Sequence, residues 1–229
     1  MLIIIIRAVA KFLLTAEWED LRTKLLRLNS ILADGRSVTV PIVIQKLLIS
    51  AEDHRHARHK GFDSRAICRA IWRRIIDGRR EGASTIEQQV VRILTNRFEL
   101  TLRRKLREIL LATLISEVVP KTAMPELYIR IGYFGWRMNG FAQACRRLRL
   151  NSSAMSLDDA AALVARLKYP EPRSLGTSRL AQIHRRREHL KRLYRRHLTD
   201  GTYSYLEVTK TNEALNSRRS FTEIAGSVS

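Results

Sequence analysis

The sequence predicts a mainly α-helical fold, and three observations support this prediction. Apolar side chains recur at helical spacing along much of the chain, as at Leu21, Leu25 and Leu28. Glycine and proline stand where these periodic stretches stop, for example at Pro120. Strand-like alternation is confined to residues 38–40, which is too short for a sheet. We therefore expect helices packed around a single core.

Length and composition favour one globular domain with extensions. The chain has 229 residues, of which 45% are hydrophobic and 28% charged. Its 42 Lys and Arg residues against 22 Asp and Glu residues give a net charge of +20, which favours polyanionic partners: nucleic acid, anionic lipid headgroups or a pyrophosphate. Two cysteines, Cys68 and Cys145, are too few for a disulfide scaffold or a cysteine-based zinc site, although one bridge between them stays open.

The first 20 residues are predicted to form a hydrophobic segment that lies in a membrane interface. The apolar run at residues 2–14 is shorter than the roughly 20 residues of a spanning helix, and it contains Arg7 and Lys11. These cations are four residues apart, so a helix would carry both on one face, opposite the apolar side chains. A secretory signal would have its charges before the apolar run, and this order is not evident here. A degenerate membrane segment and a core helix are the alternatives.

Three helices are predicted before residue 80. The first carries the leucine repeat and stops at Asp34-Gly35. The second covers residues 42–52 and follows Pro41, which suits the first turn of a helix. The third, residues 64–77, interleaves isoleucines and a tryptophan with arginines. Such a basic amphipathic helix suits a bilayer surface, and a core helix with a solvated face is the alternative.

Four further helices complete the predicted domain of residues 21–172. The first begins near Thr85, and the other three cover residues 102–118, 124–131 and 157–168. Pro170 and Pro172 close this compact region. Residues 173–229 are predicted to form an arginine-rich helix and a polar tail with the composition of a disordered segment. The arginine-rich helix presents either a solvated face or a surface for headgroups or nucleic acid.

Four segments carry the candidate functional residues. Residues 51–61, Ala-Glu-Asp-His-Arg-His-Ala-Arg-His-Lys-Gly, place two adjacent carboxylates among imidazoles and cations. Residues 82–89, Gly-Ala-Ser-Thr-Ile-Glu-Gln-Gln, form a turn whose Ser84 is the predicted helix cap. Residues 104–112 are Arg-Lys-Leu-Arg-Glu-Ile-Leu-Leu-Ala, and residues 126–135 are Glu-Leu-Tyr-Ile-Arg-Ile-Gly-Tyr-Phe-Gly.

In this order, the four segments resemble the signature motifs of the peptidoglycan glycosyltransferases. That family comprises the monofunctional transglycosylases and the polymerase domain of class A penicillin-binding proteins, and the resemblance covers about residues 38–172. It implies a single lysozyme-like α domain with a membrane-apposed basic amphipathic segment. It also implies polymerisation of lipid II into β-1,4 glycan strands, with inversion at the anomeric carbon and release of polyprenyl pyrophosphate.

Two carboxylates are the predicted catalytic residues. Glu52 is the expected base for the attacking hydroxyl, and the resemblance implies that Glu108 assists on the donor side. Arg104 and Lys105, one turn before Glu108, are expected to hold the pyrophosphate. The full set of predicted substrate-binding residues is Asp53, His59, Ser84, Thr85, Gln88, Gln89, Arg92, Arg104, Lys105, Glu126 and Tyr128. Each carboxylate could instead be an ordinary surface ion pair.

No cofactor is expected to be required, and stimulation by a divalent cation is left open. His54, His56 and His59 suggest a metal site, but solvent-facing histidines in a basic loop are commoner, so no metal ligands are predicted. Four residues depart from the family motifs: His56 replaces an aromatic residue, Arg92 a lysine, Ile93 an asparagine and Arg130 an asparagine. These departures put catalytic efficiency in doubt, whereas both glutamates are retained.

The predicted function is therefore peptidoglycan glycosyltransferase, acting on lipid II and the growing strand at an anionic membrane surface. The expected location is the outer face of a bacterial cytoplasmic membrane. No Ser-x-x-Lys or Lys-Thr-Gly signature occurs, so crosslinking would need a separate transpeptidase. One alternative is a catalytically weak assembly factor that binds lipid II or membrane. A basic nucleic-acid binder is a weaker alternative, because no nucleic-acid motif supports it.

Overall fold

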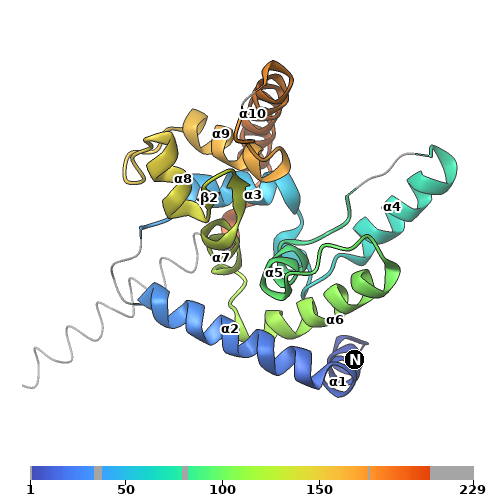
Figure 1. Cartoon of the computed structure of the whole chain (residues 1–229). Coiled ribbons are helices and arrows are strands. Elements are labelled where there is room, and N and C mark those ends of the chain that lie inside the picture. The colour runs from blue at the N-terminus through green and yellow to red at the C-terminus, as the bar shows by residue number, and fades with distance from the viewer. Residues whose placement is uncertain (1, 34–37, 79–81, 175, 207–229) are drawn as a thin grey trace, which may run out of the picture.

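The computed structural model describes residues 2–33, 38–78, 82–174 and 176–206, and its mainly helical architecture confirms the predicted fold class (Figure 1). The predicted helix stop at Asp34-Gly35 and residues 207–229 of the predicted tail lie outside the described residues. The described helices are α1 (Leu2–Leu13), α2 (Thr15–Ala33), α3 (Ile42–Glu52), α4 (Ser64–Ile76), α5 (Ile86–Thr95), α6 (Leu102–Val118), α7 (Met124–Ile131), α8 (Phe141–Leu148), α9 (Leu157–Lys168) and α10 (Thr177–Thr199), with a 3₁₀ turn at His56–Arg58.

Helix α3 forms the centre of the core. Every residue from Ile44 to Ser50 is buried, which a helix attains only when other elements cover it all round. Helices α9, α10 and α7 pack against it, and Figure 1 shows α3 running between them. Helix α5 joins this group to a second one, because it packs against both α7 and α6. The last turn of α3 is therefore attached to a tightly packed part of the core.

Side-chain caps begin four of the helices. Each cap accepts a hydrogen bond from a backbone N–H in the first turn: Asp63 at α4, Thr85 at α5, Thr101 at α6 and Ser156 at α9. The predicted cap of α5, Ser84, is one residue too early. Its hydroxyl instead accepts from the ammonium of Lys105 at 2.8 Å, so this residue belongs to the candidate site rather than to the helix end.

A short antiparallel hairpin, β1 (Tyr133–Gly135) and β2 (Met138–Asn139), was not predicted. Gly135 has φ +136°, and a Cβ there would overlap the backbone of Glu171, so a side chain would push the chain after α9 away from β1. The predicted strand-like stretch, residues 38–40, forms no strand. The carbonyl of Val38 pairs with the guanidinium of Arg130 at 2.9 Å rather than with another strand.

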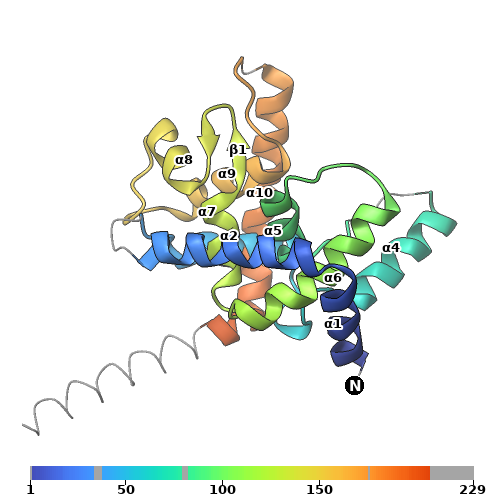
Figure 2. The same cartoon turned by 60° about the horizontal axis from the view of Figure 1, so that its bottom comes forward.

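Helix α1 turns its cationic face toward the protein. The guanidinium of Arg7 lies 3.3 Å from the carboxylate of Glu117 on α6 and donates to the Thr113 carbonyl, and the ammonium of Lys11 lies 3.0 Å from Glu117. On the other side of the helix, Ile5, Phe12 and Leu13 are exposed. Figure 2 shows α2 crossing α5 and α6 with α1 turning away at its end. None of the described helices is both long and apolar enough to span a membrane.

Candidate active site

The predicted site residues gather where the end of α3 meets the start of α5 and the first half of α6. A cavity of about 160 Å³ opens at this junction, and Glu52, Asp53, Ser84 and Thr85 are among the residues that line it. Its walls come from the first two predicted motifs and from the start of α4. The third motif reaches it through Lys105, whose ammonium is bonded to Ser84.

Gly61 allows the first motif to lie directly on α6. Its φ is +101°, and a Cβ would overlap the backbone carbonyl of Ala112. The hydroxyl of Thr85 donates to the carbonyl of Gly61 at 2.6 Å. The hydroxyl of Thr85 therefore ties the first motif to the start of α5.

Glu52 is the last residue of α3, and its carboxylate is partly exposed. The side-chain amide of Gln89 donates to it at 3.0 Å, and the guanidinium of Arg186 on α10 lies 3.6 Å away. The hydroxyl of Tyr128 on α7 donates to the Gln89 amide oxygen at 2.5 Å. Three helices thus orient this carboxylate, and one side of it remains open to the cavity.

Asp53 is buried and belongs to an internal network. It accepts from the imidazole Nε2 of His59 at 3.0 Å and from the backbone N–H of Ile86 at 3.3 Å. The ammonium of Lys121 lies 3.4 Å from His59 Nδ1 and donates to the carboxylate of Glu87. Because the charges are paired inside the protein, Asp53 and His59 hold the loop after α3 in shape.

Glu108 is buried beneath three cations. Arg92 donates to both carboxylate oxygens, at 2.7 and 3.1 Å, and Arg104 donates to one of them. This fork-to-fork pairing raises the pKa of Arg92. The Lys105 ammonium lies 3.9 Å from the carboxylate and donates to Ser84 and Gln88. Arg92 and Gln89 are three residues apart on α5, so one face of α5 links Glu108 to Glu52.

One predicted binding residue lies apart from this group. Glu126 forms an ion pair with Arg130, one turn later on α7, at 2.6 Å, and among the described residues it forms no hydrogen bond or ion pair with the other predicted site residues. Arg130 also donates to the carbonyl of Val38, so this departure from the family motif has a structural role. Ile93, another departure, packs against the core.

The comparisons with known proteins agree with the motif order. A family model described as transglycosylase matches residues 31–194. The chain belongs to the transglycosylase family. Penicillin-binding protein 1A of Neisseria gonorrhoeae is 37% identical over 132 residues, which are 57% of this chain and 16% of that protein. Penicillin-binding protein 1A of Rickettsia bellii is 33% identical over 186 residues, 78% of this chain and 22% of that protein.

The transglycosylase match confirms the predicted family and contains every predicted site residue. It ends within α10, so residues 195–206 are described by the structure but lie outside the match. The chain spans only between 16% and 22% of the two relatives named above.

Five residues of this transglycosylase site were not predicted. They are Glu87, Lys121, Arg186, Tyr205 and, as a buried group, His56. The three histidines of the first motif do not gather at one point: His54 stacks on His197, and His56 faces Glu87. Among the described residues, Asp53, His59 and Glu87 alone lie close enough to share an ion. The ammonium of Lys121 already occupies part of this group, because it donates to Glu87 and lies 3.4 Å from His59 Nδ1.

Proposed function

We propose that the protein is a peptidoglycan glycosyltransferase that polymerises lipid II into β-1,4 glycan strands. The observation that carries the proposal is the pairing of two differently held glutamates in a transglycosylase-family domain. Glu52 is oriented by amide and cation contacts beside a cavity, and Glu108 is buried among cations on the adjoining helix. The family match and the motif order support the choice of substrate.

In this proposal, Glu52 takes the proton from the 4-hydroxyl of the acceptor sugar. The oxygen of that hydroxyl forms a bond with the anomeric carbon of the lipid-linked donor, and the bond from that carbon to the pyrophosphate oxygen breaks. Attack from the face opposite the leaving group gives inversion. Gln89 and Arg186 fix the direction of the Glu52 carboxylate before the reaction, which lowers the cost of orienting it.

Arg55 and Arg69 line the cavity, and Lys105 is a third cation placed for the leaving pyrophosphate. Its ammonium is bonded to Ser84, which lines the same cavity as Glu52, whereas the guanidinium of Arg104 is directed at Glu108. Glu108 would then act by holding Arg92 and Arg104 and by keeping Lys105 at the cavity wall. The proposal requires no cofactor, because these side chains supply the positive charge, and stimulation by a divalent cation is compatible with it.

The test of the proposal is strand formation from labelled lipid II in detergent, with products separated by length. We expect polymer from the wild-type protein. Binding of lipid II without polymer would favour the assembly-factor alternative. Binding to DNA or RNA that weakens steeply with salt, together with no polymer, would favour the nucleic-acid alternative.

The rate should also depend on the protonation of Lys105. Burial lowers the pKa of this ammonium to about 8, so we expect polymerisation to slow as the pH rises through about 8. Arginine stays protonated throughout this range. Lys105→Arg should therefore move the alkaline decline upward by more than one pH unit, measured as initial rates between pH 6 and 10.

Unfolding through Lys105 cannot mimic this decline. The pKa of Lys105 is lower in the folded protein than the ordinary 10.5, so between pH 8 and 10.5 the unfolded state binds more protons. The contribution of this group to stability consequently rises with pH. An alkaline decline that is unchanged in Lys105→Arg would contradict the assignment.

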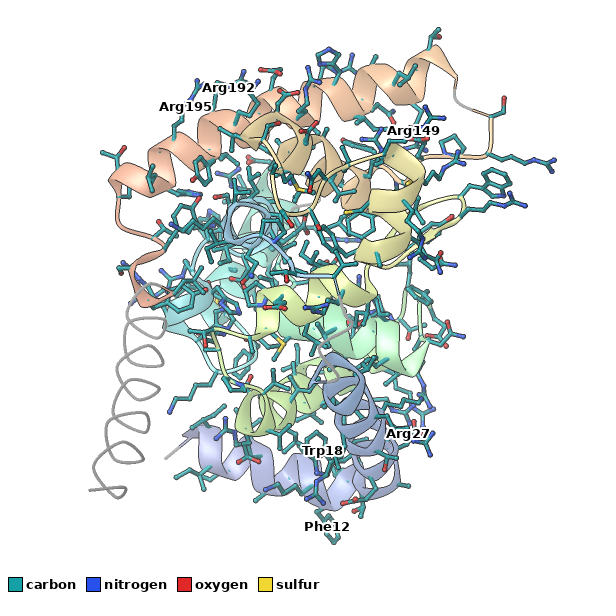
Figure 3. All side chains as sticks on the ribbon, turned by 90° about the vertical axis from the view of Figure 1, so that its left-hand side faces the viewer. Phe12, Trp18, Arg27, Arg149, Arg192 and Arg195 are labelled. Carbon is teal, nitrogen blue, oxygen red and sulfur yellow. The ribbon has the colours of Figure 1, made fainter. Side chains whose placement is uncertain are left out.

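We further propose that the domain lies on the outer face of the cytoplasmic membrane through α1 and α4. Exposed apolar side chains on α4, among them Trp72 and Ile75, are interleaved with arginines, and α1 presents Phe12 outward (Figure 3). Figure 3 shows Arg192 and Arg195 of α10 at the opposite end of the molecule. An apolar face with flanking cations suits anionic lipid.

Trp72→Ser tests this placement. Burying a large aromatic side chain contributes roughly 1.5–3 kcal/mol, so we expect at least about tenfold weaker binding to vesicles containing phosphatidylglycerol. Leu180→Ser removes an exposed apolar side chain from α10 and is the matched control. Equal loss in both variants, or none in Trp72→Ser, would reject α4 as a membrane contact.

A further inference from the structure

Residues that follow the end of the family match form hydrogen bonds with α3 just before the proposed base. Ser50, two residues before Glu52, is buried, and its hydroxyl is bonded to His197 Nδ1 at 2.9 Å and to the hydroxyl of Tyr203. The ring of Tyr203 is itself almost fully buried. Both partners belong to residues 197–206, which we call the C-terminal clamp.

The C-terminal clamp also holds the loop just after the proposed base. The hydroxyl of Tyr205 lies 2.7 Å from Nδ1 of His56, although the two residues are 149 positions apart. His56 has no exposed surface and stands where the family motifs have an aromatic residue. The departure at His56 is therefore matched by a tyrosine that lies outside the family match.

The surroundings of His56 indicate the direction of its hydrogen bond with Tyr205. Burial lowers the pKa of His56, so its imidazole is neutral. Its Nε2 lies 3.4 Å from the Glu87 carboxylate, which can only accept, so the proton of the ring belongs on Nε2. Nδ1 is then an acceptor, and Tyr205 must be the donor. Burial raises the pKa of Tyr205, which keeps its phenol protonated.

A single chain of contacts thus leads from the clamp to the residue beside the base. Tyr205 donates to His56, and His56 faces Glu87. Lys121 bridges Glu87 and His59, and His59 is bonded to Asp53, the neighbour of Glu52. Without the phenol hydroxyl, Nδ1 of His56 would be a buried acceptor with no donor, which destabilises this arrangement of the loop.

We propose that Tyr205 is a positioning residue, which orients the loop around Glu52 through His56. The effect on catalysis rests on the proposed function, whereas the hydrogen bond to His56 does not. Tyr205 touches neither substrate nor reacting atoms in this scheme. It acts by holding one arrangement of the 53–59 loop, as Tyr203 does for the last turn of α3.

The experiment compares Tyr205→Phe with the wild type by two measurements. The first is the ¹⁵N chemical shift of the His56 ring nitrogens. We expect Nδ1 to be unprotonated in both proteins and, in the variant, to move to the shift of a ring nitrogen without a hydrogen-bond donor. The second is steady-state polymerisation. We expect kcat about fivefold lower and KM within twofold, the size of one neutral hydrogen bond.

Tyr194→Phe is the matched control, because Tyr194 stacks on Tyr203 and the structure gives its hydroxyl no partner among the described residues. It should leave both measurements unchanged. Tyr203→Phe is a second test of the clamp and should also lower kcat.

The two measurements separate the possible failures. An unmoved His56 resonance would overturn the hydrogen bond from Tyr205. A moved resonance with kcat within twofold of wild type would overturn the positioning role. If the wild type forms no polymer, the proposed function fails, and the resonance still decides whether Tyr205 holds His56.

Discussion

Glu52→Gln is expected to reduce the rate of glycan polymerisation by about 10²- to 10⁴-fold, the usual contribution of a positioned general base. Glutamine keeps the size of the side chain and an oxygen that can accept from Gln89, so the hydrogen bond at 3.0 Å can still form. It cannot take a proton from the attacking hydroxyl. The measurement is the initial rate of strand formation from labelled lipid II.

Folding and substrate binding should survive this change. The ion pair between Glu52 and Arg186 is 3.6 Å long and partly exposed, so its loss should cost about 1 kcal/mol or less. Glu188→Gln makes the same chemical change on the outer side of α10 and should polymerise at the wild-type rate. An initial rate of strand formation within tenfold of wild type in Glu52→Gln would show that another group is the base.

Glu108→Gln is expected to destabilise the protein by roughly 3–5 kcal/mol, because removing one partner of a buried ion pair leaves the other charge without compensation. Glu108 is 3% exposed, and its carboxylate is the shared partner of Arg92 and Arg104. A neutral amide can accept from only one oxygen and carries no charge to offset two guanidinium groups. For a chain of this size, the melting temperature should fall by roughly 10 °C.

A second glutamate–arginine pair provides the control for Glu108→Gln. Glu126 pairs with Arg130 at 2.6 Å, four residues apart as in the Glu108–Arg104 pair, but its side chain is 37% exposed. Glu126→Gln should therefore cost no more than about 1 kcal/mol. Equal melting temperatures for the two variants would show that the burial of Glu108 does not determine its contribution to stability.

Local signals in the sequence predicted most of the helices. Helical periodicity depends on neighbours three and four residues away, so it identified α3, α6, α7 and α9 directly. The cap of α5 was misplaced by one residue because Ser84 and Thr85 are both good caps, and only the packing of Thr85 against Gly61 distinguishes them. The hairpin at Tyr133–Asn139 was missed because its strands are too short to show alternation.

The rest of the site depends on contacts between distant parts of the chain. Lys121 and Glu87 are 34 residues apart, and no local pattern links them. Periodicity likewise showed that Arg7 and Lys11 share one face of α1, but not that this face would turn inward. Glu117, on a helix about a hundred residues later, decides its direction. Such partners become visible only once the helices are packed.

The position of Lys121 has a consequence for how the loop around Asp53 responds to its surroundings. A cluster of buried carboxylates and imidazoles needs a counter-ion, and many proteins take that ion from solution. Here the counter-ion is the ammonium at the end of a side chain, bonded to Glu87 and 3.4 Å from His59. This ammonium is part of every molecule, and it reaches Glu87 when the chain before α7 packs against α5 during folding. The charge balance of this loop is therefore set during folding and does not vary with the ionic composition of the surrounding solution.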